Sequence, residues 1–93
     1  MNDAPISAFQ QAIRATHGAE AELAGRERVV ETFEGQVVWE GEVLAFDLTG
    51  HPSASRCYAW EVDGRVTAVL AVGPIDSPLM AVRAAIMEET EAN

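Results

Sequence analysis

The chain has 93 residues, 48% of them hydrophobic and 23% charged, a composition that fits one small globular domain over residues 1–93. Fifteen acidic residues against six basic ones give a net charge of −9, which disfavours nucleic acid and anionic membranes as partners. All six basic residues are arginine, so Schiff-base and P-loop lysine chemistry is excluded. A single cysteine, no signal peptide and no long apolar segment predict a cytoplasmic protein.

The first predicted element is a helix over residues 6–17. Its apolar residues recur at helical spacing and are Ile6, Phe9, Ala12 and Ile13. Ser7 and Gln10 have the spacing of a capping box, and Gly18 can adopt the left-handed conformation that ends a helix. Residues 19–25 are small and acidic without clear periodicity, which indicates a connection or a frayed helical turn.

Residues 26–74 are rich in valine, threonine and aromatic residues, which predicts four consecutive strands. The strands are expected over residues 26–33, 36–47, 56–62 and 65–72. Glu34-Gly35 and Asp63-Gly64 can each close a two-residue hairpin. The glycine, proline and polar residues of positions 48–55 predict the one substantial loop.

Ser77 and Pro78 predict the start of a second helix, which is expected to run to about Glu89. The sequence therefore predicts an α+β fold in which a four-stranded antiparallel meander is flanked by an N-terminal and a C-terminal helix. Consecutive strands disfavour a dimeric ferredoxin-like barrel, in which strands and helices interleave. The negative charge disfavours a double-stranded-RNA-binding domain.

The Asp63-Gly64 turn also predicts the register of the second hairpin. Tyr58 and Trp60 should lie on one face of the sheet, and Cys57 and Ala59 on the other. Both faces are then largely apolar. We expect the two helices to cover the small-residue face that bears Cys57, which leaves the Tyr58 face to a second copy of the chain. This arrangement predicts a homodimer or a larger symmetric oligomer.

Two segments resemble parts of small bacterial proteins that have no assigned activity, some of them carried as integron gene cassettes. The segments are GHPSASRCYAW at residues 50–60 and DSPLMAVRAAI at residues 76–86. The resemblance implies a bacterial cytosolic protein of this αββββα type. It implies no role for any particular residue.

Asp47, His51 and either Ser53 or Ser55 supply the residue types of a nucleophilic triad. Four neighbours on one loop rarely attain the geometry of a triad, and the alternative interpretation is an ordinary polar loop. A small hydrolase or isomerase that uses the His51 loop is therefore the alternative function. His17 and His51 lack the short spacing typical of metal ligands, so we predict neither a metal nor a cofactor.

The predicted function is that of a noncatalytic binding or interaction protein. The candidate ligand-binding residues are Trp39, Glu40, Glu42, His51, Tyr58 and Trp60. Aromatic faces and carboxylates both attract positive charge, so the expected ligand is a cationic or neutral amphipathic small molecule. Two alternatives stay open: the aromatic residues form a dimer core, or the two glutamates belong to a solvated strand face.

Overall fold

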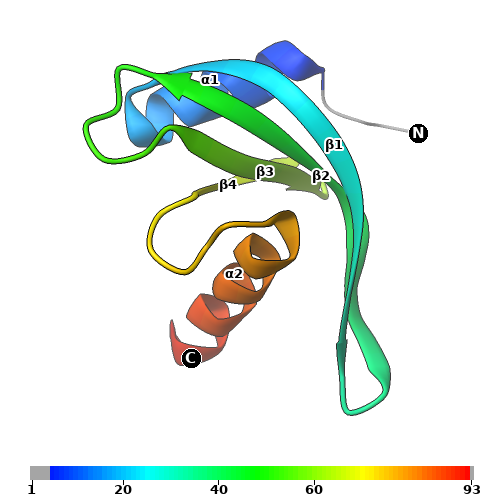
Figure 1. Cartoon of the computed structure of the whole chain (residues 1–93). Coiled ribbons are helices and arrows are strands. Elements are labelled where there is room, and N and C mark those ends of the chain that lie inside the picture. Colours follow the sequence, from blue (N-terminus) through cyan, green and yellow to red (C-terminus); the bar gives the residue numbers. More distant parts are fainter. Residues whose placement is uncertain (1–4, 93) are drawn as a thin grey trace.

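The computed structural model describes residues 5–92 and has the predicted α+β architecture (Figure 1). Its elements are α1 (Ile6–His17), β1 (Glu20–Phe33), β2 (Gln36–Thr49), β3 (Arg56–Val62), β4 (Arg65–Leu70) and α2 (Pro78–Ala92). The strands form one antiparallel sheet in the order β1-β2-β3-β4, which confirms the predicted meander. Within the described residues, neither helix has the length and apolar character needed to cross a membrane.

The helix α1 has the predicted bounds, but its N-terminus is capped differently from the prediction. Gly18 adopts a left-handed conformation with φ of 69° and ends the helix. Pro5, with extended backbone, occupies the N-cap position, so the predicted capping box of Ser7 and Gln10 is wrong. Instead, the Gln10 side-chain amide donates a 2.8 Å hydrogen bond to the carbonyl oxygen of Ala21. This bond ties α1 to the strand that follows it.

That strand, β1, begins at Glu20 rather than at Arg26, so the interpretation of residues 19–25 as a connection or helical turn is wrong. Ala21 and Leu23 alternate with exposed neighbours and pack against the core beneath α1. The pairing with β2 shifts register just after Leu23. The shift interrupts the alternation after a few residues, which is why the strand pattern is weak in the sequence.

Both predicted hairpin turns are present. Their central residues all have positive φ: Glu34 (52°), Gly35 (81°), Asp63 (53°) and Gly64 (80°). Two consecutive positive φ angles give the turn whose twist matches that of the flanking strands. The predicted register of the second hairpin is also confirmed, since Cys57 pairs with Leu70, Tyr58 with Val69, Ala59 with Ala68 and Trp60 with Thr67.

The two helices cover opposite faces of the sheet (Figure 1). The α1 face, which bears Cys57 and Ala59, has a buried core of Phe9, Ile13, Leu44, Phe46, Cys57 and Ala59. The α2 face, which bears Tyr58 and Trp60, has a buried core of Val29, Val43, Tyr58, Trp60, Ala81 and Val82. The prediction that both helices cover the Cys57 face is therefore wrong for α2.

The physical reason is the size of the aromatic side chains on the α2 face. Tyr58 and Trp60 would expose a large apolar area if that face were bare. The chain buries them with its own second helix, leaving each only 4% exposed. The face that was expected to bind a second copy is thus already covered. The homodimer stays a prediction, but the Tyr58 face can no longer serve as its interface.

The first hairpin is longer than the second. Strands β1 and β2 have 14 residues each, whereas β3 has 7 and β4 has 6. Strand β2 pairs with β3 only from Leu44 to Asp47. Residues 28–41 therefore extend beyond the rest of the sheet as a two-stranded arm, which curves past α2 (Figure 1).

Because the Cys57 thiol is buried, we expect the protein to lose stability at alkaline pH. Its side chain is fully buried, and burial raises the pKa of the thiol to about 11. The thiol of the unfolded chain titrates at about 8.5 to 9, so between these two pKa values only the unfolded chain releases the proton. The free energy of unfolding should therefore fall by about 2 to 3 kcal/mol as the pH rises from about 9 to 11.

Urea unfolding between pH 8 and pH 11, with reductant present, measures this loss. The variant Cys57→Ala lacks the titrating group, so its stability should fall less steeply over the same pH range. Parallel pH profiles for the two proteins would contradict the prediction.

Candidate functional site

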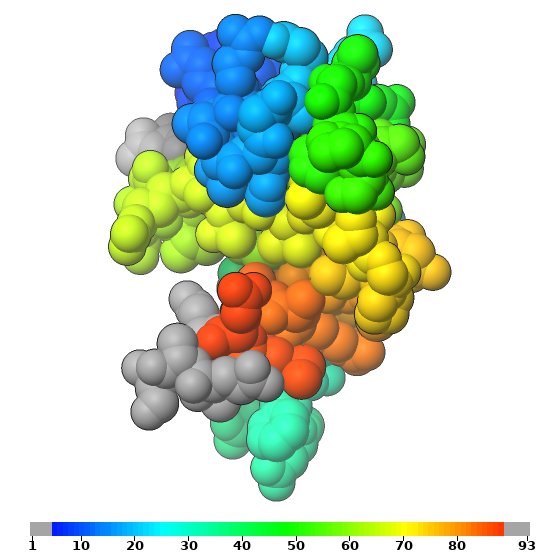
Figure 2. All heavy atoms as spheres, turned by 90° about the vertical axis from the view of Figure 1, so that its left-hand side faces the viewer, coloured from blue at the N-terminus to red at the C-terminus, as the bar shows by residue number. Residues whose placement is uncertain are grey.

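A hollow of about 750 Å³ lies between the β3–β4 hairpin, the arm and α2, and Figure 2 shows its opening between the hairpin and the helix. Its apolar lining includes Trp39, Trp60, Val69, Val82, Ala85 and Ile86. Its polar lining comprises Asp63, Arg65, Thr67 and Glu88. A mostly apolar hollow of this volume with a few polar groups is typical of sites for small organic molecules.

The hollow exists because α2 approaches the sheet closely only near its start. Ala81 and Val82 are 0% and 1% exposed, whereas Ala85 and Ile86, one turn later, are only half-buried. On the sheet side, the pairing of β2 with β3 stops at Leu44, so the arm diverges from the second hairpin. The later turns of α2 therefore face an unfilled space.

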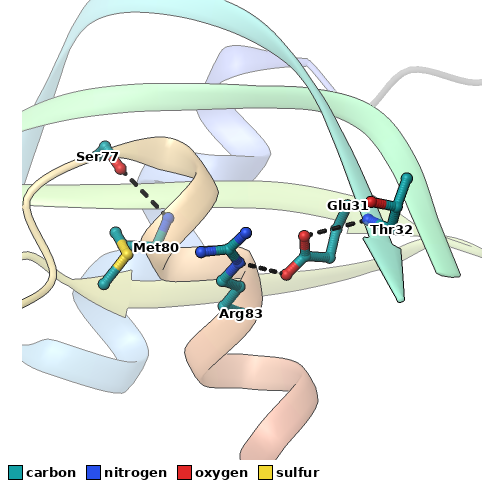
Figure 3. Close-up of polar contacts among 5 residues, drawn as sticks. All are labelled: Glu31, Thr32, Ser77, Met80 and Arg83. Atoms are coloured by element: carbon teal, nitrogen blue, oxygen red, sulfur yellow. Dashed lines mark hydrogen bonds and ion pairs between the residues drawn. The ribbon is translucent and has the colours of Figure 1, made fainter. Parts of the chain in front are cut away.

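The start of α2 is fixed by the predicted N-cap. The Ser77 hydroxyl accepts a hydrogen bond of 3.3 Å from the backbone amide of Met80 (Figure 3). Pro78 occupies the first helical position, where a missing amide proton costs nothing. The cap sets where the helix begins and hence which of its residues reach the sheet.

An ion pair attaches α2 to the arm. The Nε of Arg83 donates to one carboxylate oxygen of Glu31 at 2.5 Å, and the other oxygen accepts from the amide of Thr32 at 3.1 Å (Figure 3). Glu31 is only 9% exposed. The sequence analysis did not single out Glu31, although its spacing of two from Val29 places it on the face that meets the helix.

Trp39 and Trp60 are in contact at the edge of the hollow. Their ring centroids are 5.9 Å apart with planes at 66°, an edge-to-face arrangement. Gly41 makes room for the Trp39 indole, because a Cβ at position 41 would lie 2.9 Å from the nearest ring atom. The glycine therefore lets the indole lie against the backbone of β2.

The structure brings together two of the six predicted ligand-binding residues at the hollow, Trp39 and Trp60. Tyr58 is buried in the same α2-face core but does not line the hollow. Glu40 and Glu42 alternate with Trp39 along β2 and so lie on the opposite face of that strand. There they form ion pairs that join the two strands of the first hairpin, Arg28–Glu40 at 2.6 Å and Arg26–Glu42 at 3.3 Å.

His51 lies in the loop between β2 and β3, away from the hollow lining. Its Nδ1 accepts hydrogen bonds of 3.1 Å from the backbone amides of Ser53 and Ala54. In a nucleophilic triad this nitrogen must instead donate to a carboxylate. The nearby Asp47 accepts a 2.9 Å hydrogen bond from Arg56. The Ser53 hydroxyl also lies 3.5 Å from this nitrogen, but among the described side chains no carboxylate bonds to the His51 ring, so the loop lacks the orienting group of a triad.

His17 and His51 are neighbours in space, with ring centroids 6.5 Å apart. The Nε2 of His17 lies 3.2 Å from the carbonyl oxygen of Ala68, which can accept a hydrogen bond from this nitrogen. Among the side chains that the structure describes, residues 5–88, no group of three or more histidine, cysteine, aspartate or glutamate residues is placed to hold a metal ion.

The polar lining of the hollow was not predicted from the sequence. Thr67 could have been found, because the predicted register sets it opposite Trp60. Asp63 belongs to a predicted turn and Arg65 follows it, but nothing in the turn itself indicates what these two side chains face. Glu88 reaches the hollow only because α2 covers the Tyr58 side of the sheet.

No known protein family, curated protein or solved structure matches the chain. The resemblance of two segments to small bacterial proteins stays a prediction.

Replacing Gly41 should displace Trp39. In Gly41→Ala the added Cβ would meet the indole, so we expect the edge-to-face contact with Trp60 to be lost or altered. Near-ultraviolet circular dichroism should report the change, since these are the two tryptophans of the chain. Gly25→Ala is the matched control, because a Cβ at that strand glycine meets nothing within 4 Å. Unchanged tryptophan bands in Gly41→Ala would contradict the prediction.

Removing Arg83 should destabilise the fold. Arg83→Met leaves the Glu31 carboxylate buried without its charged partner, at a cost of about 1 to 3 kcal/mol. The same substitution should cost less in a Glu31→Gln background, which urea unfolding of the four proteins would measure. The matched control is the exposed pair Arg28–Glu40, whose coupling energy should stay below about 1 kcal/mol. Equal coupling energies in the two pairs would contradict the prediction that the Arg83–Glu31 ion pair stabilises the attachment of α2 to the arm.

Proposed function

We propose that the chain is a noncatalytic binding protein that takes up a small amphipathic molecule in the hollow. The observation that carries this proposal is an unfilled space of about 750 Å³ bordered by two tryptophans and by the apolar side of α2. Apolar walls favour an apolar ligand body because its transfer out of water is favourable. Polar lining groups would orient the ligand.

The state of the polar lining favours binding over catalysis. Within the part of the chain that the structure describes, the side chains of Asp63, Arg65, Thr67 and Glu88 form no hydrogen bond or ion pair. A catalytic group is normally held by such a partner, which fixes its orientation. Groups that are free to turn toward a ligand suit recognition.

A fluorescence titration with 3-phenylpropan-1-ol tests the proposal. Both tryptophans of the chain line the hollow, so binding should change their emission in a saturable way. The ligand should also raise the unfolding midpoint, since a ligand at one hundred times its Kd adds about 2.7 kcal/mol to the stability of the folded state.

A variant that fills the hollow provides the control for location. Ala85→Phe should abolish the fluorescence change, because the larger side chain occupies the space of the ligand. Ala15→Leu, at an exposed position of α1, should bind like the parent protein. The proposal fails if neither this alcohol nor its charged analogues bind, or if Ala85→Phe binds as well as the parent.

A further inference from the structure

The hollow contains more negative than positive charge. Asp63 lies in the β3–β4 turn and Glu88 lies on α2, so the two carboxylates line the hollow from different elements. The one arginine in the lining is Arg65. Within the described residues, the other five arginines are already paired with carboxylates elsewhere: Arg14–Glu20, Arg26–Glu42, Arg28–Glu40, Arg56–Asp47 and Arg83–Glu31.

The aromatic side chains of the lining also attract cations. An indole face carries the negative part of the ring quadrupole and attracts a cation within about 6 Å. Trp39 is half-buried and Trp60 is 4% exposed, so a cation beside them is partly removed from water. Electrostatic attraction is stronger in such surroundings than in bulk water. The net charge of −9 also raises the local concentration of cations around the molecule.

We infer that the ligand of the hollow is an organic ammonium ion. Its charged group binds near the carboxylates of Asp63 and Glu88, and its apolar body packs against Trp39 and Trp60. This inference rests on the proposed function, which requires only that the hollow bind an amphipathic molecule. It adds the charge of the ligand and the two residues that select it.

Arg65 should act on the affinity for a charged ligand in the opposite direction from Asp63 and Glu88. Its guanidinium repels an ammonium ion and attracts a carboxylate, so it opposes the two acidic side chains. Removal of Arg65 should therefore strengthen ammonium binding, whereas removal of either carboxylate should weaken it. A hollow that selects an anion through Arg65 would show the reverse signs for the same three substitutions.

Three probes of nearly equal shape test the charge: 3-phenylpropan-1-amine, 3-phenylpropan-1-ol and 3-phenylpropionate. At pH 7 and low salt, tryptophan fluorescence should give the amine a Kd about tenfold lower than that of the alcohol. The carboxylate should bind most weakly. The advantage of the amine should shrink as salt is added, because salt screens the exposed charges.

Matched substitutions test the residues. Asp63→Asn and Glu88→Gln should each weaken amine binding about threefold to tenfold and leave alcohol binding unchanged. Arg65→Gln should strengthen amine binding. Asparagine tolerates the positive φ of 53° at position 63, so this variant should keep the turn. The control Glu40→Gln removes the same charge on the face of β2 that points away from Trp39, and it should leave the amine Kd within twofold of the parent.

The possible outcomes separate this inference from the proposed function. An amine that binds no better than the alcohol, or a carboxylate that binds best, overturns the inference while the hollow remains a binding site. The inference is also overturned if Glu40→Gln weakens amine binding as much as Glu88→Gln does. The loss of affinity would then come from the net charge of the protein and not from a carboxylate at the hollow. If none of the three probes binds, the proposed function itself fails.

Discussion

The sheet is apolar on both of its faces, and most features of the molecule follow from that constraint. Along β3, Cys57 and Ala59 point to one side while Tyr58 and Trp60 point to the other, and all four are buried. A sheet of this kind cannot leave either side to water without exposing a large apolar area. The structure describes two helices over residues 5–92, and each one covers one side of the sheet.

The two helices cover their faces of the sheet to different extents. On the α1 face, small residues of the sheet such as Ala59 let the helix pack closely, and Ile13 is completely buried. On the α2 face, the bulk of Tyr58 and Trp60 limits close contact to the first turns of the helix, where Ala81 is small. Ala85 and Ile86, one turn later, are only half-buried, and they line the hollow. The constraint that recruits the second helix thus also produces the hollow.

Local signals predict most of the fold, because they act between residues close in sequence. The Asp63-Gly64 turn fixes the register of β3 and β4, and Ser77-Pro78 marks the start of α2. The face that α2 covers is set by long-range packing, and no residue near its start indicates it. For the site, the sequence indicated Trp39 and Trp60, whereas their contact depends on the absence of a side chain at Gly41.

The distribution of arginines explains why the hollow is acidic. Arg26 and Arg28 join the two strands of the first hairpin through ion pairs, and Arg83 joins α2 to the arm. With only six bases for fifteen acids, each arginine that stabilises the sheet or a helix contact is one that cannot neutralise a carboxylate elsewhere. Asp63 and Glu88 therefore lie at the hollow with Arg65 as the one basic residue in its lining. The ion pairs that hold the fold together thus leave these two carboxylates without an arginine partner, and this unbalanced charge is the basis of the ammonium ligand that we propose for the hollow.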